Sequence, residues 1–201
     1  MQTPWRRTRG LAQVAGLTLA MLALSAPGTA SAAEPTCFGK KATIVANAGV
    51  ERIEGTAGDD VIVGGDGRQI ISGGDGDDRI CGRGGSDVIG GDAGDDRMSG
   101  GRGQDFIGGQ DGDDLILGGP GPDFLNNGDE EDGDDEVFGG PGDDTMGAGD
   151  GEDKMFGESG DDFLSGGVVD SPLVDLFSGG RGTDTCNPDE EDKVRSCELR
   201  P

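Results

Sequence analysis

Histidine and tyrosine are absent from this 201-residue sequence, and tryptophan occurs once, at Trp5. Without histidine, and without a Cys-x-x-Cys pair, the chain has no ligand set for a tetrahedral zinc site. With 41 acidic and 16 basic residues and few aromatic rings, it also lacks the positive surface and the stacking platforms that nucleic acids require. Zinc binding and nucleic-acid binding are therefore disfavoured by residue type alone, whereas an acidic surface attracts other cations.

Long apolar stretches are also scarce, and the clearest is Leu11–Leu24, which is too short to span a bilayer. Three arginines precede it, and Ala30-Ser31-Ala32 provides a small-residue cleavage motif after it. This order predicts a secretory signal peptide over residues 1–32, and so a secreted, extracellular protein with no membrane span after processing. The alternative, a retained membrane anchor, fits the short segment and the cleavage motif poorly. Arg6 and Arg7 match a twin-arginine signal weakly, so the export route stays open.

Glycine and carboxylates dominate what remains, with 43 glycines and a formal net charge of −25. Such a composition predicts disorder by default. From Ala46 to Asn187, however, the chain repeats every nine residues in fifteen units, two of which are longer, with 12 and 13 residues. Position four is glycine in all but one unit, position six is Asp in all but two, and position eight is apolar in every unit. A disordered acidic linker has no reason to keep an apolar residue in register, so the repeat predicts a fold.

Each nonapeptide, such as GGDGDDRIC at Gly73–Cys81, combines a glycine-rich turn with a very short strand. Glycines at positions one, two and four allow positive φ and close backbone approach, and positions seven to nine alternate outward, inward and outward. Two units then complete one coil, and stacked coils bury the position-eight side chains between two parallel sheets. The sequence predicts an all-β fold, a right-handed parallel β-roll with two repeats per coil.

The position-six Asp side chains create an electrostatic problem in such a roll. Coils stack about 4.8 Å apart, which brings each of these carboxylates close to its counterpart two units later. At that spacing two carboxylates repel by about 1 kcal/mol in water and by about 3 to 4 kcal/mol at an effective dielectric constant of 20. Carboxylate and carbonyl oxygens in flexible turns suit Ca²⁺ better than Mg²⁺, which requires strict octahedral geometry. The sequence therefore predicts several Ca²⁺ ions as the missing component.

The units resemble the Gly-Gly-x-Gly-x-Asp-x-U-x repeat, with U a large apolar residue, of the RTX or hemolysin-type calcium-binding family. The stretch CFGKKATIVANAG (Cys37–Gly49) resembles the opening of small exported members from high-GC Gram-positive bacteria, with Thr43, Ile44 and Val45 as a further capping strand. The resemblance implies Ca²⁺ between turns two units apart, held by backbone carbonyls and position-six carboxylates. The implied carboxylate ligands are Asp60, Asp78, Asp87, Asp96, Asp105, Asp114, Asp123, Asp135, Asp144, Asp153, Asp162 and Asp184.

Three places in the array are expected to bind calcium weakly. Gln69 and Glu51 replace the position-six Asp, and Asp175 follows an insertion in which Leu173 replaces the turn glycine. Asp135 also follows a long unit, so its turn departs from the regular calcium-binding pattern as well. The position-five acids Asp59, Asp77, Asp95 and Asp113 are expected to face solvent instead.

Four cysteines in an exported chain favour two disulfides over free thiols. Three pairings are compatible with the sequence, and the favoured one joins Cys37 to Cys81 and Cys186 to Cys197, one bridge at each end. The expected organisation is a signal peptide (1–32), an N-terminal cap (33–45), a β-roll of fifteen repeats (46–187) and a C-terminal cap (188–201).

An exported calcium-binding roll that folds on binding Ca²⁺ is the function that this pattern favours. An enzyme is disfavoured because the chain has no histidine, no nucleophile elbow and no segment outside the repeats long enough for a catalytic domain. An EF-hand is excluded because no such ligand frame occurs, even in DEEDGDDE (Asp129–Glu136). The alternative that stays open is a calcium-stiffened structural or adhesive module at the cell surface, which could contact a partner through the apolar loop 166–177.

Overall fold

The computed structural model describes residues 34–46, 49–126, 133–147, 149–166, 175–188 and 192–199, and these form strands, turns and bends without a helix. Within these ranges, no helix is long and apolar enough to cross a membrane. The predicted signal peptide and most of the loop 166–177 lie outside the described residues.

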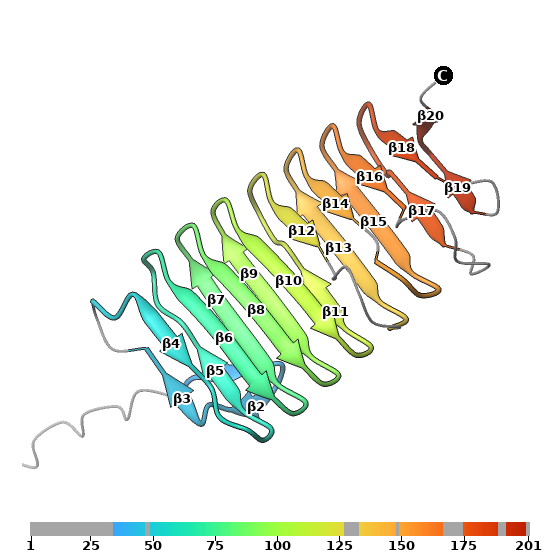
Figure 1. Cartoon of the computed structure of the whole chain (residues 1–201). Helices are drawn as coiled ribbons and strands as arrows, with labels where there is room; N and C mark the ends of the chain where they lie inside the picture. The colour runs from blue at the N-terminus through green and yellow to red at the C-terminus, as the bar shows by residue number, and fades with distance from the viewer. Residues whose placement is uncertain are drawn as a thin grey trace, which may run out of the picture. The chain divides into compact units, whose positions relative to one another are not determined.

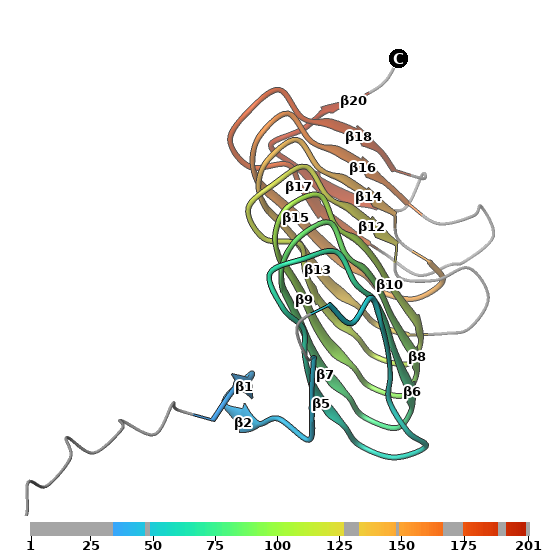
Figure 2. The ribbon, with the colours of Figure 1, turned by 90° about the vertical axis from the view of Figure 1, so that its left-hand side faces the viewer.

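Two nine-stranded sheets run along the stacked coils (Figure 1). The odd sheet contains β3 (Ile44–Val45), β5 (Val61–Val63), β7 (Arg79–Gly84), β9 (Arg97–Arg102), β11 (Leu115–Leu117), β13 (Glu136–Pro141), β15 (Lys154–Ser159), β17 (Leu176–Ser178) and β19 (Lys193–Arg195). The even sheet contains β4 (Arg52–Glu54), β6 (Ile70–Asp75), β8 (Val88–Ala93), β10 (Phe106–Asp111), β12 (Phe124–Asn126), β14 (Thr145–Gly147), β16 (Phe163–Ser165), β18 (Thr185–Asn187) and β20 (Glu198–Leu199). Figure 2 shows the coils stacked one behind another, with the odd-numbered and even-numbered strands on opposite sides.

Every pairing inside these sheets is parallel and joins strands that are two repeats apart. Ile107 in β10, for example, lies between Ile89 in β8 and Leu125 in β12. The shift of 18 residues between neighbours is two nonapeptides, so one coil contains two repeats. The predicted all-β parallel roll is thereby confirmed.

The core is a single column made of the position-eight side chains, which are at most 5% exposed. In strands such as β11, β14 and β16 the three predicted positions are half-buried, buried and half-buried, as the alternation of a strand requires. One apolar residue per repeat is enough because each side chain packs between those of the coils on either side. The column consists of Ile53, Ile62, Ile71, Ile80, Ile89, Met98, Ile107, Ile116, Leu125, Val137, Met146, Met155, Leu164, Phe177 and Cys186.

Seven strands are longer than the three residues that the sequence pattern predicts. β6 to β10, β13 and β15 each have six residues and continue through positions one to three of the next repeat. Position two has a left-handed backbone but still pairs across coils, as Gly74 (φ +108°) does with Asp92 (φ +77°). The glycine-rich turn is therefore partly sheet, because its backbone groups bond to the turns of the neighbouring coils.

Both ends of the roll extend beyond the nonapeptides. At the C-terminal end β19 and β20 add one strand to each sheet, where the sequence predicts only a cap. At the N-terminal end β3 pairs with β5, and an antiparallel pair, β1 (Thr36–Cys37) and β2 (Lys40–Lys41), lies beside the odd sheet (Figure 2). The structure joins Cys37 to Cys81 and Cys186 to Cys197, which is the favoured pairing.

Candidate metal centre

The position-six carboxylates form two columns, one at the turns that enter the odd sheet and one at the turns that enter the even sheet. All are at most 7% exposed, although Asp is among the residues that are rarely buried. The odd column contains Asp60, Asp78, Asp96, Asp114, Asp135, Asp153 and Asp175. The even column contains Asp87, Asp105, Asp123, Asp144, Asp162 and Asp184. The structure thus brings together all of the predicted ligands, and Asp175 besides.

A backbone hydrogen bond orients each of these carboxylates. The N–H of Asp78 donates to Oδ1 of Asp96 one coil later at 2.7 Å, and Asp105 donates to Asp123 in the same way at 2.8 Å. The same bond recurs along both columns at 2.6 to 3.1 Å. The periodic backbone therefore holds Oδ1 of each carboxylate in place. This in turn sets the direction in which Oδ2 points.

The second oxygen is the unusual feature of these turns. In nine residues Oδ2 is buried and has no hydrogen-bond partner: Asp78, Asp87, Asp96, Asp105, Asp114, Asp123, Asp144, Asp162 and Asp184. A buried unpaired polar atom costs about 1 to 3 kcal/mol, and a charged one costs more. Nine such atoms in register indicate a common ligand that compensates them.

The first glycine of each repeat shows what these oxygens face. A Cβ built on Gly82 would lie 2.6 Å from Oδ2 of Asp87 and 2.7 Å from the carbonyl oxygen of Gly100, which belongs to the next coil. At Gly118, both Oδ2 of Asp123 and the Gly139 carbonyl oxygen would lie 2.6 Å away. Two hydrogen-bond acceptors from adjacent coils therefore converge beside a residue without a side chain, and a cation or a proton between them makes that arrangement favourable.

Eight of these carboxyl groups, from Asp78 to Asp162, have raised pKa values. Burial is the main cause that raises them, and repulsion from neighbouring carboxylates adds to it, while the backbone N–H bond opposes both. The pKa rises to about 6 for Asp87 and Asp162, about 7 for Asp96, Asp123 and Asp144, and about 8 for Asp114. The same cause raises the pKa of Asp78 and Asp105. Without a cation, the roll favours protonated carboxyl groups.

The donor set fits a hard cation that binds oxygen. Among the described residues, no three Asp, Glu or Cys side chains come close enough to hold a metal by themselves. A cation at the turns must therefore combine carboxylate oxygens with backbone carbonyls, as at Asp87 and Gly100. Ca²⁺ accepts six to eight such oxygens in flexible geometry, which suits glycine turns better than the rigid octahedron of Mg²⁺.

The first turns of the array differ from the rest. Both oxygens of Asp60 already accept protein hydrogen bonds: Oδ2 from the N–H (2.7 Å) and hydroxyl (2.8 Å) of Thr56, and Oδ1 from the Thr43 hydroxyl (2.9 Å). Desolvation raises the pKa of Asp60, but these bonds outweigh it and the pKa is lowered. At the next turn Gln69 occupies position six, and its Oε1 accepts the Gly65 N–H at 3.1 Å. In these two turns, protein donors already bond to the side-chain oxygens at position six. Asp60 therefore has less need of a metal than the other predicted ligands.

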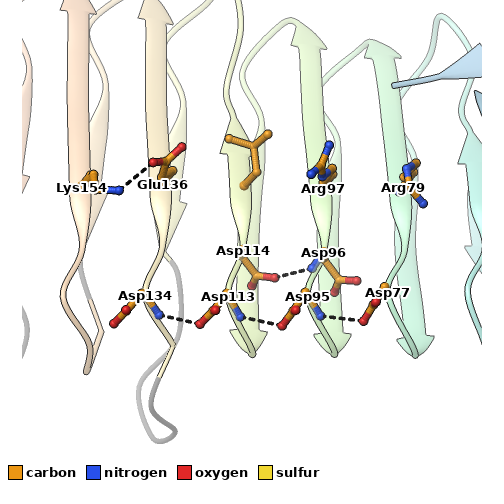
Figure 3. Close-up of a pocket in the computed structure, with 11 residues that line it drawn as sticks. Asp77, Arg79, Asp95, Asp96, Arg97, Asp113, Asp114, Asp134, Glu136 and Lys154 are labelled. Atoms are coloured by element: carbon orange, nitrogen blue, oxygen red, sulfur yellow. Dashed lines mark hydrogen bonds and ion pairs between the residues drawn. The ribbon is translucent and has the colours of Figure 1, made fainter. Parts of the chain in front are cut away.

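A second acidic row lies outside the odd column (Figure 3). The exposed position-five residues Asp77, Asp95, Asp113 and Asp134 follow one another, and each N–H bonds to Oδ1 of the preceding one at 2.9 to 3.2 Å. Their predicted exposure is therefore observed. Together with Arg79 and Arg97 they line a groove that also reaches Asp96 and Asp114.

One member of the odd column was missed by the sequence analysis. Asp192 lies beyond the last nonapeptide, and its Oδ1 accepts the N–H of Asp175 at 3.1 Å. Val194, two residues later, packs against the core column. The signal was present as Asp-Lys-Val-Arg, which has the order of positions six to nine, but the turn before it has no glycine at position four.

Comparison with known proteins agrees with this geometry. A family model described as the RTX calcium-binding nonapeptide repeat (4 copies) matches residues 45–68, 54–89, 90–125 and 131–164. Together these matches cover more than half of the chain. None of the curated proteins compared with the chain matches it.

Proposed function

The chain belongs to the RTX calcium-binding nonapeptide-repeat family, and from that premise we propose that it is an exported protein whose repeat array folds as several Ca²⁺ ions bind between its turns. Repeats of this family bind calcium, with several ions along the array. Export, the coupling of folding to binding, and the individual ligands are what the proposal adds.

The observation that carries the proposal is the row of buried Oδ2 atoms without partners. The proposed ligands are the position-six carboxylates from Asp60 to Asp184, together with carbonyl oxygens of the facing first glycines, as in the pair Asp87 and Gly100. Bound calcium supplies positive charge that compensates these oxygens. The backbone N–H bonds to Oδ1 hold each carboxylate in place, and burial strengthens its attraction for a cation because water is excluded.

Folding and calcium binding are expected to be coupled because each turn uses oxygens from two coils. In the unfolded chain these oxygens are far apart, so no preformed site exists and the binding free energy becomes folding free energy. Without metal, the unpaired carboxylates and the entropy of many glycines oppose the roll. Asp60 is the weakest of the proposed ligands because protein donors already occupy both of its oxygens.

Circular dichroism of the exported chain, recorded in excess chelator and then in millimolar Ca²⁺, tests the coupling. The expected result is a largely unfolded spectrum that becomes β-rich when calcium is added. A β-rich spectrum in chelator that calcium leaves unchanged would refute the coupling. Calorimetric titration then counts the ions, and a stoichiometry of several per chain is expected.

Export is supported by the disulfides and by the family. RTX repeat proteins are generally extracellular, and two disulfides fit an oxidising environment. We propose cleavage after Ala32, followed by the N-terminal cap, the roll of residues 46–187 and a C-terminal segment. Mass spectrometry of the exported chain would identify the new N-terminus.

The proposed function does not involve catalysis by this protein. The β-roll of this family is typically structural and not catalytic, and the position-six carboxylates that could form an acid–base pair are all part of the repeat. The alternative of a calcium-stiffened surface module is favoured by the two continuous nine-stranded ladders, which make a regular scaffold. Retention of the chain on cell walls in the presence of calcium would support it, whereas calcium binding without retention would count against it.

A further inference from the structure

We propose that the N-terminal end of the roll, residues 34–72, is a metal-independent nucleus on which the calcium-dependent coils assemble. The inference rests on the proposed coupling of calcium binding to folding, and it adds a direction to that process. This segment, called the N-terminal nucleus below, contains β1 to β5 and the first half of β6.

Two turns of the N-terminal nucleus differ from the later ones at position six, the proposed ligand position. One has a neutral side chain there, and the other has an Asp whose oxygens accept hydrogen bonds from protein donors. Gln69 occupies position six of the even column, is only 5% exposed, and bonds through Oε1 to the N–H of Gly65. Asp60 receives donors from Thr56 and Thr43 at both oxygens. From Asp78 onward the corresponding Oδ2 atoms of nine residues have no partner. The buried charges that require a cation therefore begin after the nucleus.

The backbone of these turns is different as well. In the nine-residue repeats that follow, the fourth-position glycines have left-handed φ angles, such as +111° at Gly76 and +132° at Gly85. Gly58 and Gly67, at the same position in the nucleus, do not adopt that conformation. The two turns thus have a geometry of their own, which they reach with protein hydrogen bonds only.

A second apolar layer stabilises this end and no metal contributes to it. β5 is buried at all three of its residues, because Cys37 and Phe38 cover Val61 and Val63 on the outer face of the odd sheet. Elsewhere in the described roll, position seven of a strand is at most half-buried. The disulfide between Cys37 and Cys81 closes a separation of 44 residues, which restricts the unfolded chain around the nucleus.

The nucleus also presents the donors that orient the first two orphaned carboxylates. The N–H of Asp60 donates to Oδ1 of Asp78, and the N–H of Gln69 donates to Oδ1 of Asp87, both at 2.7 Å. A preformed row of donors lowers the entropy lost when the next coil is added, and repeat proteins propagate by such nearest-neighbour terms. The coil that contains Asp78 and Asp87 is therefore the first to bind calcium, and later coils follow from it.

Hydrogen exchange followed by mass spectrometry on the intact exported chain tests the nucleus. In chelator, amides of β5 (Val61–Val63) are expected to exchange at least tenfold more slowly than amides of β15 (Lys154–Ser159). With Ca²⁺ both strands should be protected. Equal and rapid exchange of both strands in chelator would overturn the nucleus and leave calcium-coupled folding intact. Protection of both in chelator would instead refute the coupling itself.

Two pairs of variants test the cause. Gln69→Asp adds a buried negative charge at this turn, so protection of β5 in chelator should fall at least tenfold and return with Ca²⁺. Gln104→Asp adds the same charge at an exposed turn position and should leave it unchanged. Unchanged protection in Gln69→Asp would show that the neutral amide does not make this end independent of metal.

The disulfide is tested in the same way. The double substitution Cys37→Ser with Cys81→Ser should lower the protection of β5 in chelator, whereas Cys186→Ser with Cys197→Ser should not. If both pairs lower it equally, the stability of this end is not local and the proposal is wrong.

Discussion

The backbone N–H of Asp96 donates a 2.8 Å hydrogen bond to Oδ1 of Asp114 in the next coil, while Oδ2 of Asp114 is buried without a partner. Oδ1 of the side chain thus stabilises the packing of one coil on the next, whereas Oδ2 requires a cation. The repeat places this arrangement at turn after turn, so the same residue both positions the backbone and makes the roll depend on charge compensation.

Asp114→Asn should separate these two roles. Asn keeps an oxygen for the Asp96 N–H but loses the charge, so calorimetry should show at least one Ca²⁺ fewer per chain. In chelator at pH 8.5 the variant should be more stable than the parent by about 1 kcal/mol, because a buried charge has been removed. The control is Asp113→Asn, an exposed neighbour that should keep the stoichiometry. Equal losses of calcium in both variants would show that position six is not special.

The stability of the metal-free roll should fall as the pH rises. The pKa values of Asp96, Asp123 and Asp114 are raised from 3.8 to between about 7 and about 8. Between about pH 4 and pH 8 the folded state therefore binds more protons than the unfolded state, so acid favours folding and this stability is lost progressively across that interval. Circular dichroism in chelator at pH 5 and pH 8 checks the sign, and a higher content of β-structure at pH 8 would contradict it.

Calcium should reverse this dependence because it competes with protons for the same oxygens. Its apparent affinity should weaken as the pH falls below about 8, where Asp114 becomes protonated, and further below about 6, where Asp87 follows. Calorimetric titrations at pH 5.5 and pH 7.5 measure the difference. An affinity that does not change with pH would argue against the buried carboxylates as ligands.

Arg83→Gly should stabilise the roll. Arg83 occupies position two with φ +81°, a left-handed conformation that costs a residue with a side chain about 1 to 2 kcal/mol. Glycine removes that strain but adds entropy to the unfolded chain, which leaves a net gain of about 0.5 to 1 kcal/mol. Arg83→Ala removes the same charge and keeps the strain, so it should show no comparable gain. Thermal unfolding in saturating Ca²⁺ compares the three proteins.

Gly118→Ala should destroy a turn that Gly108→Ala leaves intact. The added Cβ at Gly118 would lie 2.6 Å from both Oδ2 of Asp123 and the carbonyl oxygen of Gly139, whereas at Gly108 its nearest neighbour, the Asn126 carbonyl oxygen, is 3.5 Å away. We expect a loss of about 1 to 3 kcal/mol and of bound calcium at the first position only. Calcium stoichiometry and unfolding midpoints distinguish the two variants, and similar behaviour would refute the proposed role of the first glycine.

The sequence by itself determined the parallel roll, its register and the buried column from Ile53 to Cys186, because one apolar residue every nine positions can be buried only if two repeats form each coil. It also determined which carboxylates stand in two columns, since position six recurs with the same period. These features are local and repeated, so each unit confirms the others.

Only the tertiary structure decided which oxygens lack partners. Asp60 and Asp78 both occupy position six of their repeats. Thr43 and Thr56 donate hydrogen bonds to Asp60, whereas no donor reaches Oδ2 of Asp78. Asp192 joins the odd column without a glycine turn, because β19 can pair with β17 once the roll exists. Hydrogen-bond satisfaction depends on neighbours a whole coil away, and such contacts have no signature within a single nonapeptide.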